Sequence, residues 1–486
     1  MAQIQNLKKV RLKKLEAIEK AGFLPFPGST KRTHKISDAL TSFPSLSRSK
    51  KQIVLTGRMV SKREHGKSTF LHIEDGSGRI QLYFKQDKLG EKGYRFFLDN
   101  FDVGDVVEVT GVLFKTKKGE KTLEARDFKM LAKSLLPLPE KWHGLKDTEE
   151  RFRKRYLDFI FNPEVKKKFK LRSKIVTELR KFLEDNGFLE VETPILQPIY
   201  GGAKATPFKT HHKTLNIPLY LRISPELYLK RLIIGGFEKV YEIGKCFRNE
   251  GMDKSHNPDF TMLEFYWAYA DYKDMMKFTE KMFSYLLNSI CKSQKITYEG
   301  REINFKTPWK RIEFSELLRK YADVNLDEIH IEALRKKAKK WGIESKGDKA
   351  ELADEIYKKV CRSKISHPTF VIHHPLGAFP LAKQLEKNPK KTANFQLVVA
   401  NCELINAFSE LNNPLEQEKR WKEQETLYKK GLGEAQRMDK DYLEALEHGM
   451  PPASGFGMGV DRLVALLSNS HSLREVILFP TMKPKK

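Results

Sequence analysis

Short segments in which apolar and polar residues alternate fill the chain from about Gln52 to Leu131. Alternation with a period of two is typical of half-buried β-strands. Roughly five such strands in so short a stretch predict a small Greek-key barrel of the OB type, which binds single-stranded nucleic acid on a basic, aromatic face. The clearest segments are Val54–Val60, Phe70–Ile73, Arg79–Phe84 and Val106–Leu113.

Helical periodicity flanks this region. The basic segment 5–21 has apolar residues at three-residue spacing and predicts a short helix. A longer amphipathic stripe follows Asn162, a suitable N-cap, with Pro163 as the first helical residue and Gly187 after the helix end.

The second half of the chain mixes strands and helices. Lys239–Ile243 and Phe260–Tyr269 are rich in β-branched and aromatic residues, and the long polar loop between them predicts two antiparallel strands. The fold class is therefore α+β, with a mainly antiparallel sheet flanked by helices. The predicted parts are a basic helical arm (residues 1–45), the barrel (46–135), a linker (136–162) and a second domain (163–486) with a lysine-rich helical insertion at about 312–365, which has no residue of catalytic character.

Reactive side chains gather on one face of the second predicted strand. Phe260, Glu264 and Tyr266 share this face because side chains alternate along a strand. Arg248 and His256 lie just before it in the sequence. An aromatic ring, a carboxylate and a phenol beside these basic groups suit a ligand with phosphate, a flat base and an amine. Solvated charges on a plain hairpin are the alternative that this pattern leaves open.

A glycine-punctuated segment, Gly455–Arg462, forms the second notable motif. Glycine at every second position lets the backbone approach a ligand closely. Arg462 falls at the start of an apolar, helix-like run. The spacing is neither that of a P-loop nor that of a dinucleotide-binding turn, because Pro451 and Pro452 precede it.

The charge balance favours a polyanionic partner. Lys and Arg number 90 against 63 acidic residues, a formal net charge of +27, and nucleic acid is the usual partner of such chains. The lysines of the N-terminal helix either contact phosphate or form a solvated face. Four scattered cysteines without a C-x-x-C pair indicate a reducing compartment and argue against zinc. Without a membrane-length apolar run or a signal-peptide core, we expect a cytoplasmic protein with no membrane partner.

Three ordered motifs resemble those of the class II aminoacyl-tRNA synthetases: Gly187–Pro194, Phe247–Glu264 and Gly455–Arg462. Tyr220–Lys230 and Asn406–Leu411 are similar to the bacterial type of lysyl-tRNA synthetase, and the similarity runs from about Val10 to Pro484. The resemblance implies an OB-fold anticodon-binding domain followed by a class II catalytic domain. It also implies a ligase that activates L-lysine with ATP to lysyl-adenylate and transfers it to the 3′ end of lysine tRNA.

The resemblance assigns residues to the activation step. Such a site must position the reactants and stabilise charge on phosphate oxygens. Arg248 matches the arginine that bridges the attacking carboxylate and the α-phosphate, and Arg462 matches the one that holds the γ-phosphate. These two are the expected catalytic residues, and Arg462 is expected to enclose the adenine with Phe260. The further expected ATP contacts are Glu250, His256, Asn257, Phe260 and Glu403.

Lysine recognition needs acceptors for an ammonium group at each end. By the resemblance, Glu226 and Glu264 take the α-ammonium, and Glu410 takes the ε-ammonium with Tyr266. Aspartyl and asparaginyl relatives need a cation where this chain has Glu410, which favours lysine. The expected lysine-binding residues are Gly202, Glu226, Glu264, Tyr266, Asn406, Phe408 and Glu410.

One expected magnesium ligand departs from the family pattern. The family usually has carboxylates at both positions that bind Mg²⁺ on the ATP phosphates, and this chain has Glu403 and Gln396. Mg²⁺ prefers charged oxygen ligands, so we expect Glu403 to be the main ligand and the affinity to be weaker. Strict alternation would put Glu403 and Asn406 on opposite faces of their strand, so a bulge is expected between them.

The barrel and the first motif imply macromolecular partners. Phe70 and Gln81 match residues that stack on and hydrogen-bond the central anticodon base, and Arg58 and Glu120 match further anticodon contacts. Core packing is the alternative for Phe70. The family also implies a homodimer through the first motif, although packing within one chain would leave the same pattern. The expected partners are thus lysine tRNA, L-lysine, ATP and a second copy.

Two other functions fit parts of the sequence. A lysine ligase acting on a translation-factor protein would lack the N-terminal barrel. A synthetase-derived RNA-binding or regulatory protein with lost catalysis would not need Arg248 and Arg462, although Gln396 keeps this alternative open.

Overall fold

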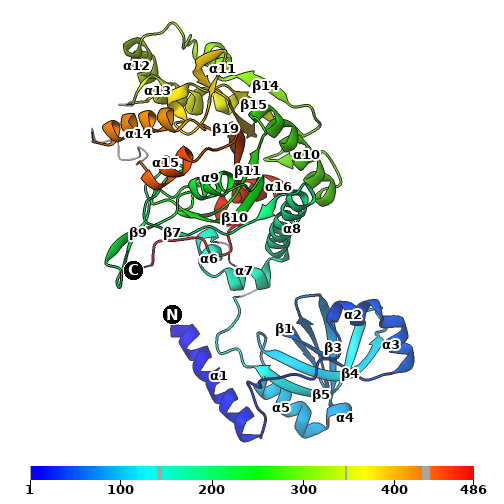
Figure 1. The fold of residues 1–486 in the computed structure, drawn as a ribbon. Helices are drawn as coiled ribbons and strands as arrows, with labels where there is room; N and C mark the ends of the chain where they lie inside the picture. Colours follow the sequence, from blue (N-terminus) through cyan, green and yellow to red (C-terminus); the bar gives the residue numbers. More distant parts are fainter. Residues whose placement is uncertain (1, 140–144, 146, 345–346, 430–437, 486) are drawn as a thin grey trace. The chain divides into compact units, whose positions relative to one another are not determined.

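The computed structural model describes residues 2–139, 145, 147–344, 347–429 and 438–485. The chain divides into two compact units, Met1–Lys146 and Asp147–Lys486 (Figure 1). Across the described residues, no helix is both long and apolar enough to cross a membrane.

An eight-stranded sheet, in the order β14-β15-β18-β19-β20-β11-β10-β6, is the centre of the second unit. Its neighbours are antiparallel except for the pairs β14–β15 and β10–β6, so the predicted mainly antiparallel sheet is confirmed. Its strands are β6 (Leu189–Glu190), β10 (Lys239–Phe247), β11 (Asp259–Ala268), β14 (Lys310–Glu313), β15 (Thr369–Ile372), β18 (Asn394–Val399), β19 (Cys402–Ser409) and β20 (Ala453–Gly459). Smaller sheets contain β7 (Leu196–Gln197), β8 (Lys209–His212), β9 (Ile217–Leu221), β12 (Lys295–Tyr298), β13 (Arg301–Asn304), β16 (Gln384–Leu385) and β17 (Asn388–Thr392).

The two faces of this sheet pack against different helices. Leu263 and Phe265 point into the main core with apolar residues of α8 (Pro163–Asp185), α10 (Tyr272–Ile290) and α16 (Val460–Leu467). Alternate residues such as Tyr266 point to the other face. There they meet α9 (Glu226–Ile234) and α15 (Lys440–Glu447), and α14 (Pro414–Lys429) lies beside α15 (Figure 1).

The predicted start of α8 is confirmed at Pro163, and Gly187 after its end has the positive φ of 82° that glycine tolerates. The Asn162 side chain does not cap the helix. It donates instead to Asp158 Oδ1 at 2.6 Å.

Two helices, α6 (Thr148–Arg153) and α7 (Arg155–Phe161), occupy the stretch expected to be linker. Buried Arg155 donates to the carbonyls of Arg474 and Leu478, at 2.7 and 3.1 Å, and so fixes α7 to the second unit. Much of the described chain between Phe314 and Lys364 is helical. It contains α11 (Phe314–Ala322), α12 (Ile331–Lys339), α13 (Lys349–Ile356) and a π-helical turn at Tyr357–Cys361.

The first unit is a closed five-stranded barrel in the order β1-β2-β3-β5-β4, which confirms the predicted OB-type fold. Parallel pairing of β3 with β5 closes it. The strands are β1 (Ile53–His65), β2 (Ser68–Glu74), β3 (Arg79–Lys85), β4 (Val106–Lys115) and β5 (Lys121–Ala132), and the helices are α1 (Ala2–Lys20), α2 (Ile36–Thr41), α3 (Phe43–Ser49), α4 (Gln86–Leu89) and α5 (Glu91–Asn100).

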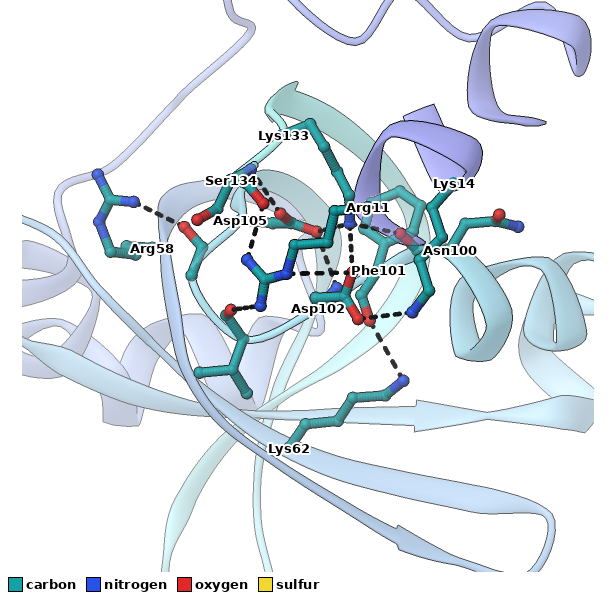
Figure 2. A network of polar contacts seen from close by, with 12 residues as sticks. Arg11, Lys14, Arg58, Lys62, Asn100, Phe101, Asp102, Asp105, Lys133 and Ser134 are labelled. Atoms are coloured by element: carbon teal, nitrogen blue, oxygen red, sulfur yellow. Dashed lines mark hydrogen bonds and ion pairs between the residues drawn. The ribbon is translucent and has the colours of Figure 1, made fainter. Parts of the chain in front are cut away.

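The N-terminal arm is integrated into the barrel. Ile18 of α1 and Ile36 of α2 belong to the barrel core. Arg11 donates to the carbonyls of Ser134 and Val103, at 2.7 and 3.0 Å, and Lys14 donates to Asp102 Oδ1 at 2.6 Å (Figure 2). Two basic residues of α1 therefore anchor the helix, while Lys8, Lys9 and Lys13 are exposed.

A buried lysine is the centre of this anchor. The Lys133 side chain is inaccessible to solvent, and its ammonium donates to Asn100 O, Asp102 Oδ2 and Asp105 Oδ2 at 2.7, 2.7 and 2.9 Å (Figure 2). Asp105 also accepts from the Ser134 amide at 2.8 Å. All three ammonium protons are thus satisfied, which is the condition under which a buried charge is tolerated.

Replacing Lys133 by Met should destabilise the barrel by about 3–5 kcal/mol, because buried Asp105 and partly buried Asp102 lose their shared cation. Lys129→Met is the matched control, since that side chain is 48% exposed and should matter little. Hydrogen exchange of barrel amides, measured by mass spectrometry on the whole chain, gives the opening free energy. If both variants lower the opening free energy of the barrel amides equally, Lys133 has no special structural role.

Candidate active site

A cavity of about 760 Å³ lies over the face of the large sheet opposite to the main core. Its walls come from segments far apart in the sequence, which the sheet order brings together because β11, β20, β19 and β18 are neighbours. The predicted site residues that line it are Gly202, Glu226, Arg248, Glu250, His256, Asn257, Phe260, Glu264, Tyr266, Gln396, Glu403, Asn406, Phe408 and Arg462.

The predicted hairpin supplies the first wall. β10 and β11 pair antiparallel, with Glu242 opposite Glu264 and Phe247 opposite Asp259. Phe260, Glu264 and Tyr266 all reach the cavity, as expected from the period of two along a strand. The alternation in the sequence therefore identified which face of β11 lines the cavity.

The expected bulge supplies the second wall. The register of β18 on β19 shifts between Leu397, which faces Ile405, and Val398, which faces Glu403. The extra residue, Leu404, lets Glu403 reach the same cavity as Asn406.

The two arginines lie at this cavity with part of their donor capacity unused. The Arg248 guanidinium carbon is 5.1 Å from the centroid of the Phe260 ring, and the buried Nε has no hydrogen-bond partner. Arg462 donates from Nη1 to the Glu403 carbonyl at 3.0 Å, and its Nη2 is 3.4 Å from His256 Nε2. Both cations can therefore take an anionic ligand.

Unlike the arginines, Asn257 already uses its side-chain donor in a hydrogen bond within the protein. It is buried, and its amide donates to the Asp259 carbonyl at 2.6 Å. This bond shapes the loop at the entrance to β11.

Buried carboxylates occupy the inner part of the site. Glu264 accepts from Ser224 Oγ at 2.8 Å and from the Tyr266 hydroxyl at 3.4 Å. Burial, together with nearby Glu226, raises the pKa of Glu264 to about 8. Gly202 has a φ of 84°, and a β-carbon there would lie 2.9 Å from Glu226 Cβ, so only glycine fits.

Glu410 lies behind the cavity wall. Its carboxylate is fully buried, and Oε2 forms an ion pair with Lys230 of α9. The Lys230 ammonium also donates to Glu226 Oε1 at 2.6 Å. The sequence analysis gave Lys230 no role. Its spacing of four from Glu226, which places the two on one helix face, was the available signal.

The helical insertion contributes side chains that were also missed. Glu351, Asp354 and Lys358 line the cavity, and Glu351 accepts from Lys204 Nζ at 2.6 Å. Charged residues on a lysine-rich helix look solvated in sequence, so no local pattern could have indicated these positions.

Two side chains of the cavity wall carry oxygen atoms of the kind that can bind magnesium. The Glu403 carboxylate lines the cavity, as does Gln396, whose buried Oε1 has no hydrogen-bond partner. In the described part of the chain, no three His, Cys, Asp or Glu side chains form a metal-binding group. One carboxylate and one unpartnered amide oxygen fit an ion that takes its remaining ligands from phosphate and water.

The barrel carries its own predicted residues on its outer face. Phe70 is half-buried, lies outside the barrel core and stacks on Tyr83 with ring centroids 4.6 Å apart. Gln81 donates to Glu120 Oε2 at 2.8 Å. Arg58 does not pair with these residues; its guanidinium donates instead to the Gly104 carbonyl at 2.6 Å.

Comparisons with known proteins agree with this architecture. The family model of the "tRNA synthetases class II (D, K and N)" matches residues 147–483, and that of the "OB-fold nucleic acid binding domain" matches residues 53–131.

Among similar proteins are those named lysine–tRNA ligase from three bacteria. The one from Carboxydothermus hydrogenoformans is 48% identical, with 99% of each chain covered. That from Syntrophomonas wolfei is 47% identical over 99% of this chain and 98% of the relative. That from Aquifex aeolicus is 51% identical over 89% of this chain and 73% of the relative. With the family model covering most of its length, this chain belongs to the class II tRNA synthetases of the D, K and N group.

Proposed function

We propose that this chain is a lysine–tRNA ligase, which activates L-lysine with ATP and transfers it to the 3′ end of lysine tRNA. The observation that carries the proposal is the joint placement of three buried carboxylates, Glu226, Glu264 and Glu410, beside Arg248 in or behind one cavity. A ligand with two ammonium groups and one carboxylate complements these charges. The names of the similar bacterial proteins support the same substrate.

In the activation step, the lysine carboxylate attacks the α-phosphorus of ATP. A bond forms between carboxylate oxygen and phosphorus, and pyrophosphate leaves with the electrons of the broken P–O bond. Arg248 would hold the attacking carboxylate and the α-phosphate together, and Arg462 would bind the γ-phosphate. Glu403 and Gln396 would hold a magnesium ion, whose charge would offset that of the phosphates.

Phe260 and Arg462 would enclose the adenine, with Glu250, His256 and Asn257 as further nucleotide contacts. At the amino-acid end, Gly202, Glu226 and Glu264 would bind the α-ammonium, and Asn406 the carboxylate. Phe408 would contact the methylene chain, and Tyr266 and Glu410 the ε-ammonium.

We further propose that the barrel reads the anticodon through Phe70, Gln81, Arg58 and Glu120. A second copy would dock on the segment after α8, where Leu189, Ile195 and Leu196 are exposed. The site of action would be the cytoplasm.

Lysine-dependent ATP–pyrophosphate exchange tests the proposal directly. A ligase incorporates labelled pyrophosphate into ATP only when lysine is present. A synthetase-derived RNA-binding protein gives no exchange at any lysine concentration, and that result would overturn the proposal.

Glu410→Gln should lower kcat/KM for lysine, because a desolvated ammonium loses its charged partner. The expected loss of transition-state stabilisation is about 2–5 kcal/mol. The KM for ATP should change little. Exchange kinetics at varied lysine and ATP give both values, with exposed Glu447→Gln of α15 as the control. Unchanged lysine kinetics would place the ε-ammonium elsewhere.

Gln396→Glu should lower the magnesium concentration needed for half-maximal exchange, since a carboxylate binds Mg²⁺ better than an amide oxygen does. Exposed Gln384→Glu adds the same charge away from the cavity lining and serves as the control. If the natural chain shows no exchange at any magnesium level and the variant does, the natural protein is a non-catalytic relative.

Phe70→Ala should remove a base-stacking contact of about 1–3 kcal/mol and lower tRNA charging, while exchange stays near normal. Phe70→Leu separates stacking from packing, because leucine keeps apolar volume but has no ring. Both variants should charge tRNA poorly. Recovery in Phe70→Leu, or an equal loss in charging and exchange, would contradict the stacking role.

A further inference from the structure

The ion pair between Lys230 and Glu410 brings an ammonium of the protein itself next to the proposed lysine pocket. Lys230 is 1% exposed, and its Nζ lies 5.5 Å from the centroid of the Phe408 ring. Burial alone would lower the pKa of Lys230, but Glu226 and Glu410 raise it above its ordinary value, so the amine is charged.

The two oxygens of Glu410 have different surroundings. Oε2 forms the ion pair with Lys230, whereas Oε1 has neither an ion-pair contact nor a hydrogen-bond partner. A β-carbon on Gly455 would lie 2.2 Å from this Oε1 and 2.5 Å from Tyr266 Cε1. Gly455 pairs with both Tyr266 and Phe408 across the sheet, and all three line the cavity. Because Gly455 has no side chain, the buried Oε1 lies directly behind the part of the cavity wall that Gly455, Tyr266 and Phe408 form.

The charges around this part of the wall can be counted. Glu226, Glu264 and Glu410 provide three carboxylates, and Lys230 provides one ammonium. The carboxylates outnumber this ammonium by two, so a cationic ligand would favour their ionised forms. Tyr442 of α15 and Tyr266 are also close to these groups, and burial raises the pKa of both, so they stay neutral.

We propose that Lys230 is a positioning residue for substrate recognition: its ammonium holds Oε2 of Glu410, so that Oε1 is aimed at the cavity and accepts the ε-ammonium of the substrate. The proposal rests on the function proposed above, since it explains how that pocket selects a second ammonium group. Lys230 acts through Glu410 and does not itself touch the reacting atoms.

The test is a double-mutant cycle in the full chain, measured by ATP–pyrophosphate exchange. The variants are K230M, E410Q, K230M/E410Q and, as the control, K277M, which alters a lysine that is 70% exposed on α10. K230M should raise the KM for lysine by about 10- to 100-fold, with kcat within about 3-fold and the KM for ATP unchanged. The double variant should be no worse than E410Q within about 2-fold, because the two residues act as one unit.

Independent, multiplying effects of K230M and E410Q would overturn the proposal. A lower KM for lysine in K230M would also overturn it, because Lys230 would then be a competitor for the pocket. If K230M does not fold, K230R and K230R/E410Q carry the same comparison, since a misplaced guanidinium can lower lysine affinity only where Glu410 is present. A natural chain without lysine-dependent exchange refutes the proposed function itself, whereas an active chain with additive effects refutes only the role of Lys230.

Discussion

Three carboxylates buried around one cavity impose the main physical constraint on the second unit. Glu226, Glu264 and Glu410 lack the hydration that stabilises a charge in water, and the charge of Glu226 further disfavours ionisation of the other two. The protein compensates within a few ångströms, because Ser224 donates to Glu264 and Lys230 pairs with the other two. Incomplete compensation is what leaves the cavity able to attract a cation.

Features that depend on a local pattern could be predicted. The alternation along β11 identified the face that lines the cavity, and the proline at the start of α8 marked that helix correctly. The barrel followed from its short, evenly spaced strands. In each case the signal lies in a few neighbouring residues, so no tertiary information was needed.

Features that depend on packing between distant segments could not be predicted from the pattern. Lys230 pairs with Glu226 on its own helix, but it meets Glu410 only when α9 packs against the end of β19. Glu351 and Lys358 reach the cavity only because the insertion folds against the sheet unit. The helices α6 and α7 lie in a stretch that looks like a charged linker, and Arg155 is buried there by contacts with the distant C-terminal segment. The roles assigned to individual cavity residues came from the resemblance.

The bulge between β18 and β19 also sets how much change this hairpin can tolerate. Hairpin turns are ordinarily places where a chain gains or loses residues with little harm. Here Leu404 is the one residue that brings Glu403 into phase with Asn406. Deleting Leu404, or adding a residue beside it, would put Glu403 and Asn406 on opposite faces of the sheet. One of the two would then point toward the main core. The hairpin is therefore expected to accept substitutions more readily than changes in length.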